Sequence, residues 1–252
     1  MIHFVGAGCG APDLITVRGA RLLAEADVII YAGSLVNPDL LSYKKASCRV
    51  FNSAEMTLDE VIAVMRRTDA ERLSLVRLHT GDPALYGAIR EQMDRLKELS
   101  IPFQVCPGVS AFSGAAAALQ AEYTLPAVSQ SVVITRMAGR TPVPERESIR
   151  AFAAHGATMV IFLSAGMTQA LQAELLAGGY APETPAAIVY KASWPDEKVL
   201  RCTVETLHRT AEENSVSHLA LITVGGFLGA DYNTSKLYDP AFTTAFRKGT
   251  EA

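Results

Sequence analysis

The sequence has few of the features that mark membrane or nucleic-acid-binding proteins. Its longest apolar stretches, such as residues 219–224, fall well short of the roughly 20 residues that a membrane-spanning helix needs. Basic side chains are not in excess either, with 23 Lys and Arg against 26 Asp and Glu and a net charge of −3. A chain without a cationic surplus does not coat a polyanion. We therefore expect neither a nucleic-acid partner nor a membrane.

Cysteine is also scarce. The chain has four cysteines, and no two of them are spaced as Cys-x-x-Cys. This excludes a zinc knuckle and a disulfide framework, and no metal site is predicted. Residues 1–5 have no basic segment ahead of an apolar one, so they are interpreted as a first strand and not as a secretion signal. A reducing cytoplasm is the expected compartment.

What the sequence does contain is an α/β pattern. With 252 residues, 49% of them apolar, two domains of modest size are expected. In residues 1–118, short β-rich runs alternate with helical spacing, which predicts a mostly parallel five-stranded sheet with crossover helices. The strands are predicted at 2–5, 28–31, 49–52, 73–78 and 103–106. The helices are predicted at 17–26, 58–67 and 84–99.

From residue 119 onward the pattern changes, since strands lengthen and turns carry Pro and Gly. Residues 119–252 are predicted to form a second domain with a mixed sheet. Its strands are predicted at 131–136, 159–163, 186–190 and 219–224. No flexible linker separates the two α/β domains, so they are expected to pack firmly. The segment after Gly229 is polar and aromatic, and its role stays open.

A glycine-rich loop, Gly-Ala-Gly-Cys-Gly-Ala, follows the first strand at residues 6–11. Glycine lets a backbone approach a ligand closely, and the loop fits the dinucleotide pattern G-x-G-x-x-A. That pattern also requires an acidic residue after the second strand, where this chain has Tyr-Ala-Gly-Ser at 31–34. An NAD-linked oxidoreductase is therefore disfavoured, and a purely structural tight turn remains an alternative for the loop.

Two more glycine-bearing turns follow the fourth and fifth strands. They are His-Thr-Gly-Asp-Pro at 79–83 and Cys-Pro-Gly-Val-Ser-Ala at 106–111. Ligands of parallel sheets bind at the carboxyl ends of the strands, which is where all three turns lie. Asp82 has a competing interpretation as the cap of a helix that begins near Ala84. Because three such turns converge on one sheet edge, a shared pocket is predicted.

In order and over the whole length, these turns resemble those of the tetrapyrrole (precorrin) methylases, which use S-adenosylmethionine. Three further stretches, at 31–36, 135–145 and 189–197, are similar to the branch of this family that methylates precorrin-4 at C11, with or without cobalt. The resemblance implies two α/β domains with a cofactor cleft between them. It also implies a homodimer.

The resemblance further implies which residues contact S-adenosylmethionine. These positions are Cys9, Thr80, Gly81, Asp82, Leu85, Ser110, Ala111, Leu163 and Ala192. The family usually has Gly-Pro-Gly-Asp-Pro in its first loop, whereas this chain has Gly-Cys-Gly-Ala-Pro at 8–12. This departure is expected to change the rigidity of the loop on its substrate side. The uroporphyrinogen-III methylases have an acid where this chain has Ala32, which argues against that earlier reaction.

A polycarboxylate substrate requires cations. Arg136, Arg140 and Lys191 lie in the stretches similar to the C11 branch and are predicted to bind it, because guanidinium groups pair with carboxylates in a bidentate way. A proton leaves the macrocycle during or after methylation. His79 is the nearest candidate for the base, and a hydrogen-bonded structural histidine is the competing interpretation.

The predicted activity is S-adenosylmethionine-dependent methylation of precorrin-4 at C11, which gives precorrin-5 in cobalamin biosynthesis and releases S-adenosylhomocysteine. Two alternatives stay open. One is methylation of another precorrin or cobalt-precorrin in the same pathway, and the other is a non-catalytic tetrapyrrole carrier. Whether the substrate contains cobalt is not decided by the sequence.

Overall fold

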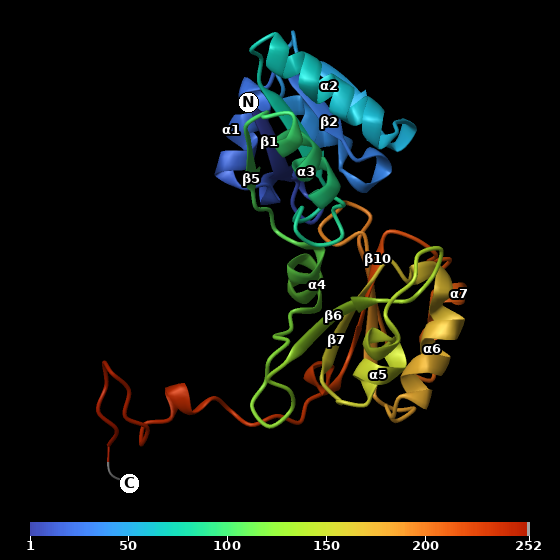
Figure 1. Ribbon diagram of the computed structural model, residues 1–252. Coiled ribbons are helices and arrows are strands. Elements are labelled where there is room, and N and C mark those ends of the chain that lie inside the picture. Colours follow the sequence, from blue (N-terminus) through green and yellow to red (C-terminus); the bar gives the residue numbers. More distant parts are fainter. Residues whose placement is uncertain (251–252) are drawn as a thin grey trace. The chain divides into compact units, whose positions relative to one another are not determined.

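A computed structural model describes residues 1–250, and its chain divides into two compact units (Figure 1). The first unit consists of Met1–Ala115 together with a short segment from much later in the sequence, Lys191–Glu197. The rest of the chain forms the second unit. The division after Ala115 falls inside helix α4 (Ala111–Leu119).

The first unit is built on a sheet of five parallel strands in the order β3-β2-β4-β1-β5. This confirms the predicted parallel sheet. The strands are β1 (Ile2–Gly6), β2 (Val28–Tyr31), β3 (Arg49–Asn52), β4 (Leu75–His79) and β5 (Phe103–Cys106).

Both faces of this sheet are buried because the apolar strand residues point alternately to either side. On one face, Val5 and Ile29 pack with Leu23 of α1 (Val17–Glu25). On the other face, Phe4 and Ile30 pack with residues of α2 (Leu58–Ala70) and α3 (Arg90–Glu98). The chain thus forms two hydrophobic clusters on a single sheet.

The predicted helix at 84–99 is wrong in its first part, because α3 begins only at Arg90. Tyr86 and Ala88 have φ values of 55° and 48°, which no right-handed helix accommodates. Gly87 is packed so closely on Pro83 that a Cβ there would overlap the Pro83 carbonyl oxygen. The segment between β4 and α3 is therefore a turn.

The second unit contains a mixed sheet in the order β6-β7-β10-β8-β9, in which only β6 and β7 are parallel. Its strands are β6 (Val132–Arg136), β7 (Thr158–Phe162), β8 (Pro185–Tyr190), β9 (Lys198–Thr203) and β10 (Ala220–Val224). The edge strand β9 was not predicted, because it follows directly on a motif-rich segment and its exposed residues include charged ones.

Three helices cover one face of the second sheet (Figure 1). They are α5 (Ile149–Ala153), α6 (Thr168–Ala177) and α7 (Leu207–Glu213). Residues from all three join Met159, Ile188 and Ile222 of the sheet in one buried cluster. This burial against the sheet supplies the main stabilisation of the second unit.

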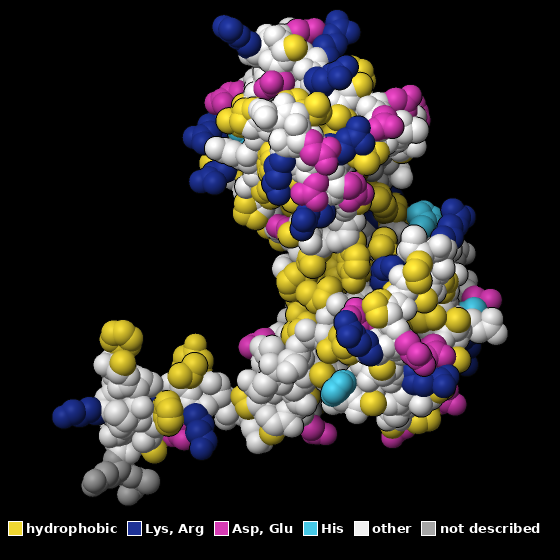
Figure 2. Space-filling view, viewed as in Figure 1, with side chains coloured by type: hydrophobic (Ala, Val, Ile, Leu, Met, Phe, Trp, Pro, Cys, Tyr) yellow, Lys and Arg dark blue, Asp and Glu magenta, His cyan; other side chains and the backbone are white. Residues whose placement is uncertain are grey.

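On the face of the first unit that Figure 2 shows, basic and acidic side chains are mixed, and neither sign of charge forms a separate patch.

After Gly229 the chain leaves the second sheet and contains a short turn of 3-10 helix, Lys236–Tyr238. Tyr238 and Phe246 of this segment are exposed. No helix within residues 1–250 combines the length and the apolar character that crossing a membrane requires.

Candidate functional site

The candidate site lies at the carboxyl edge of the first sheet. Strands β4, β1 and β5 are neighbours there, and each ends in one of the three glycine-bearing turns. In this strand order, the connection from β1 leads toward the β3 edge of the sheet, to β2, whereas the connection from β4 leads toward the β5 edge, to β5. Such a reversal of strand order is where open α/β sheets bind their ligands.

Backbone contacts lock the first two turns together. Gly8 and Gly81 exchange hydrogen bonds, with N···O distances of 3.3 Å from the Gly8 amide and 2.9 Å from the Gly81 amide. A Cβ on Gly6 would lie only 2.6 Å from both the Cα of Gly108 and the carbonyl oxygen of Gly81. Glycine is required at Gly6 because the backbones of the other two turns occupy the space of a side chain.

Asp82 joins the second turn to the third. One carboxylate oxygen accepts a hydrogen bond from the Ala84 amide at 2.8 Å, and the other accepts one from the Gly108 amide at 2.9 Å. Asp82 therefore caps a local turn, as the competing interpretation proposed, although the turn does not continue into a helix. It also holds the two turns together. A Cβ on Gly81, whose φ is +59°, would lie 3.3 Å from the Ala111 amide nitrogen.

The segment Lys191–Glu197 packs on the glycine-rich loop within the first unit. The Ser193 hydroxyl accepts a hydrogen bond from the Ala11 amide at 2.9 Å and lies 3.4 Å from the Cys9 sulfur. A Cβ on Gly114 would approach Cys9 to 2.7 Å and the Ala192 Cβ to 3.4 Å. Two predicted cofactor positions that are far apart in sequence, Cys9 and Ala192, thus line the same small packing site.

All of the predicted cofactor residues except Leu163 belong to the first unit. Leu163 follows β7 in the second unit, has a φ of +53° and is 63% exposed. An exposed apolar side chain on left-handed backbone is costly, and such strain concentrates at functional sites. The next residue, Ser164, is buried and accepts a hydrogen bond from the Met137 amide at 2.9 Å, which ties the ends of β6 and β7 together.

The three predicted substrate cations differ in what they contact. Arg136 donates hydrogen bonds to the carbonyl oxygens of Met137, Thr141 and Pro142 at 3.1, 3.3 and 2.9 Å, so it holds its own loop. Lys191 pairs with Asp196 at 2.7 Å and lies over the indole ring of Trp194. Arg140 is exposed and makes no hydrogen bond or ion pair with any residue in 1–250. Arg140 is the best placed of the three for an external carboxylate.

His79 is buried and only 4% exposed. Its ring stacks on Phe4 with a centroid separation of 6.2 Å, and its Nε2 has no hydrogen-bond partner among the described residues. Burial, together with the neighbouring cation of Arg77, lowers the pKa of His79 to about 3. The imidazole is therefore neutral at pH 7 and lies inside the domain, which favours the structural interpretation.

Two buried polar residues in and near the first sheet were not predicted from the sequence. Arg77 donates hydrogen bonds to Gln92 at 3.2 Å and to the Ile30 carbonyl at 3.3 Å, and burial lowers its pKa to about 10. Asn37 is 4% exposed and donates a hydrogen bond to the Gly10 carbonyl at 3.0 Å. A charged residue in the middle of the buried strand β4 was a visible signal for Arg77, whereas nothing local marked Asn37.

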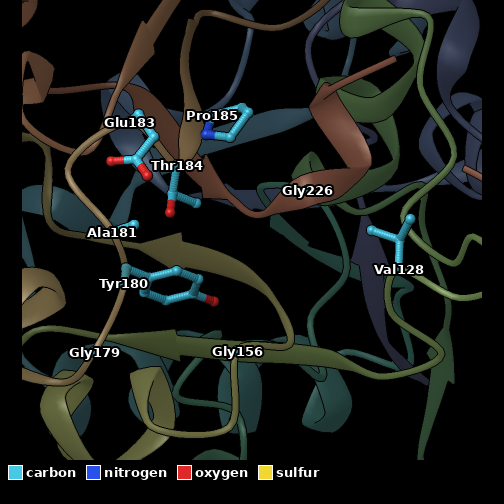
Figure 3. A pocket seen from close by; sticks show the side chains of 9 residues that line it. All are labelled: Val128, Gly156, Gly179, Tyr180, Ala181, Glu183, Thr184, Pro185 and Gly226. Atoms are coloured by element: carbon cyan, nitrogen blue, oxygen red, sulfur yellow. The ribbon is translucent and has the colours of Figure 1, made fainter. Parts of the chain in front are cut away.

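Two surface hollows lie in the second unit and contain none of the predicted site residues. The larger, of about 420 Å³, is lined by Tyr180, Glu183, Pro185 and neighbouring residues (Figure 3). The other, of about 350 Å³, is lined by Thr168, His208 and Glu212, among others. Neither lining includes Lys or Arg, so neither suits a polycarboxylate. Within residues 1–250, no three His, Cys, Asp or Glu side chains are grouped to hold a metal ion.

The fold and the turns define a class of protein. It is a two-domain α/β protein whose first sheet presents interlocked glycine turns at the carboxyl ends of its strands, where sheets of this kind bind small molecules. The profile of the Tetrapyrrole (Corrin/Porphyrin) Methylases matches residues 1–208. The chain belongs to this family, and it is a methyltransferase.

Three proteins of this kind match the chain over nearly their whole length. The chain is 49% identical to the cobalt-precorrin-4 C(11)-methyltransferase of Methanocaldococcus jannaschii, over 98% of this chain and 96% of the relative. A solved cobalt precorrin-4 methyltransferase superposes with a TM-score of 0.89 at 44% identity, covering 91% of this chain and 96% of the other. The uroporphyrin-III C-methyl transferase of Thermus thermophilus, solved with S-adenosyl homocysteine, gives a TM-score of 0.75 at 26% identity, covering 90% and 92%.

Proposed function

We propose that this chain transfers a methyl group from S-adenosylmethionine to C11 of precorrin-4, or of its cobalt-containing form, in cobalamin biosynthesis. The observation that carries the proposal is the interlocked set of turns at Gly6–Gly8, Thr80–Asp82 and Gly108–Ala111, in a chain so similar to relatives named for this reaction. Relatives are named for the cobalt-containing form and for the form without cobalt, so the proposal covers both.

The residues at the sheet edge fit S-adenosylmethionine. Its adenine is neutral and its methionine part is zwitterionic, so backbone amides and carbonyls can hold both without a large side-chain charge. Glycines at 6, 81 and 108 let the three turns pack backbone against backbone, so that peptide groups of all three lie together at this edge. When bound, the sulfonium supplies the electrophilic methyl group. The proposed contacts are Cys9, Thr80, Gly81, Asp82, Leu85, Ser110, Ala111, Leu163 and Ala192.

The chain's own contribution is chiefly alignment. Attack of an electron-rich ring carbon on a sulfonium methyl needs no covalent enzyme intermediate, and alignment alone gives effective molarities of about 10⁵ to 10⁸ M. We propose that Arg140 binds a substrate carboxylate, and that Arg136 keeps the loop that carries Arg140 in shape. Lys191, already paired with Asp196, is proposed to contribute a weaker contact. No proton transfer is assigned to the buried His79.

Separate incubations test this proposal. Purified protein receives methyl-labelled S-adenosylmethionine with precorrin-3, precorrin-4 or cobalt-precorrin-4, and the methylated carbon is assigned by NMR. Label at C11 of either precorrin-4 form is expected. Label only in the precorrin-3 reaction would assign the chain to another step of the pathway.

A non-catalytic tetrapyrrole carrier is the second candidate. The altered first loop, with Cys9 and Ala11 where the resembling family usually has Pro and Asp, is the observation that favours it. Binding of the macrocycle without any transfer of label would support the carrier. The homodimer implied by the resemblance is proposed as well, and light scattering of the purified protein tests it.

A further inference from the structure

The peptide unit between Gly10 and Ala11 is held at both of its polar ends by side chains. Its carbonyl oxygen, on Gly10, accepts a hydrogen bond from Nδ2 of Asn37 at 3.0 Å. Its N–H, on Ala11, donates to Oγ of Ser193 at 2.9 Å. The two holding residues are distant in sequence from the loop and from each other. No other peptide of the loop is gripped by side chains at both ends in this way among the described contacts.

Packing prevents this peptide from moving aside. A Cβ on Gly10 would overlap Cδ1 of Trp194 and the carbonyl oxygen of Ala192. Rotating the peptide plane by half a turn would point its N–H at the Asn37 amide donor and would leave the buried Asn37 Nδ2 without an acceptor. An unpaired buried donor costs about 1–3 kcal/mol. The present orientation of the peptide is therefore strongly preferred.

Both holding side chains are themselves fixed. Oδ1 of Asn37 accepts the Asp39 amide at 3.0 Å, and this bond leaves Nδ2 to face Gly10. Ser193 has a φ of +64°, and its amide donates to the Glu197 carboxylate at 2.6 Å. A strained backbone conformation that is tied down at its amide is typical of a segment that positions other groups.

We propose that Asn37 and Ser193 are positioning residues for the tetrapyrrole, which lock the Gly10–Ala11 peptide so that the loop presents one shape to the macrocycle. This inference rests on the proposed function. The turns proposed to bind the cofactor are joined by other bonds, between Gly8 and Gly81 and between Asp82 and Gly108. Releasing the peptide leaves those bonds in place, so the effect falls on the macrocycle and not on the cofactor.

The test uses Asn37→Asp, Ser193→Ala and the double variant in the full chain. Asn37→Asp keeps the acceptor for Asp39 and replaces the donor to Gly10 by a carboxylate oxygen, which repels the Gly10 carbonyl oxygen. We expect Ser193→Ala to raise KM for precorrin-4 by about tenfold, the effect of losing one hydrogen bond, and Asn37→Asp to raise it at least as much, while kcat falls less than about threefold. Calorimetry should give a Kd for S-adenosylhomocysteine within about twofold of the unchanged protein. Because both residues hold one peptide, the double variant should show less than the product of the two effects.

Asn52→Asp is the matched control. Oδ1 of Asn52 also accepts an amide two residues ahead, that of Ala54, but its Nδ2 contacts only Glu55 on the surface. This variant should leave KM unchanged. The inference is overturned if the Asn37 and Ser193 variants leave KM unchanged, or if the Kd of S-adenosylhomocysteine rises in step with KM.

Macrocycle binding is also titrated by its absorbance, with S-adenosylhomocysteine present, so that the result does not depend on turnover. Unchanged protein that binds the macrocycle but transfers no methyl group would refute the proposed function. Under that outcome, weaker macrocycle binding by the variants would still support the positioning role. If the unchanged protein binds no macrocycle, both the function and the inference are refuted.

Discussion

The carboxyl ends of the parallel strands differ between the two sheets. In the first sheet, the turns after β1, β4 and β5 are joined by backbone hydrogen bonds, by the Asp82 carboxylate and by glycines that leave no room for side chains. In the second sheet, the loop after β6 is held by the side chain of Arg136, and Leu163 after β7 is exposed. The first edge is thus shaped by backbone and the second by side chains.

This difference suggests a division of labour. A backbone-built edge tolerates few substitutions and suits a cofactor that is common to a whole family. An edge built from side chains can change its specificity through single substitutions.

The largest effect is expected for Gly108→Ala. The added methyl group would overlap the Gly81 carbonyl oxygen and crowd the Gly6 Cα, so the turns must separate. We expect a loss of at least about 3 kcal/mol of stability or of all measurable binding of S-adenosylhomocysteine. Thermal unfolding and calorimetry measure the two quantities.

The matched change in the second unit is Gly139→Ala, whose methyl group would lie 3.5 Å from Met167, an ordinary contact distance. It should change stability by less than about 0.5 kcal/mol. Equal damage by the two alanines would contradict the contrast between the edges.

Asp82→Ala removes the carboxylate that bridges the Ala84 and Gly108 amides. Hydrogen bonds to a charged group contribute about 1.5–3 kcal/mol, so the Kd of S-adenosylhomocysteine should rise about 10- to 100-fold. Calorimetry on a variant that stays folded by circular dichroism measures this. An unchanged affinity would remove Asp82 from the cofactor site.

His79 makes the first unit sensitive to acid. Its pKa is about 3 in the folded chain and ordinarily 6.5, so between these values the unfolded chain binds a proton that the folded chain does not. Stability should therefore fall as the pH drops below about 6.5, by about 2 kcal/mol between pH 7 and pH 5. Urea unfolding at both pH values should show this loss in the unchanged protein and a smaller loss in His79→Leu. Equal losses in both would mean that His79 becomes protonated in the folded chain.

The smallest effect is expected at the second edge, for Arg140→Ala. An exposed ion pair contributes about 0.2–1 kcal/mol, so KM for the macrocycle should rise by up to about fivefold while the Kd of S-adenosylhomocysteine stays constant. Steady-state kinetics at saturating cofactor measures KM. A change in cofactor affinity instead would place Arg140 elsewhere in the site.

Local pattern was enough to predict most of the strands. Val28–Tyr31 and Phe103–Cys106 are short β-rich runs between turns, and the structure has strands with these same bounds. The start of α3 was wrong because the apolar spacing continues through residues 84–89, although the backbone there is left-handed at Tyr86 and Ala88. The spacing of apolar residues indicates which side of a helix would be buried, but it does not indicate whether the backbone φ angles are negative, as a right-handed helix requires.

The candidate site was harder to predict. The convergence of three turns follows from strand order, and the sequence indicated it. The packing of Lys191–Glu197 on the glycine-rich loop depends on contacts of Gly10 with Trp194, which no local pattern encodes. The hydrogen bonds of Arg136 to carbonyl oxygens of its own loop could not be predicted from the sequence either. The residues assigned to cofactor and substrate through the resemblance remain predictions.

Hydrogen–deuterium exchange with and without S-adenosylhomocysteine tests the central claim most directly, because it reads all the turns in one experiment. Slower exchange on ligand binding is expected at residues 6–9, 80–85 and 108–111 and at Ala192, with little change in the strands of the second sheet. Protection confined to the hollow around Tyr180 and Glu183, or no protection at the three turns, would contradict it.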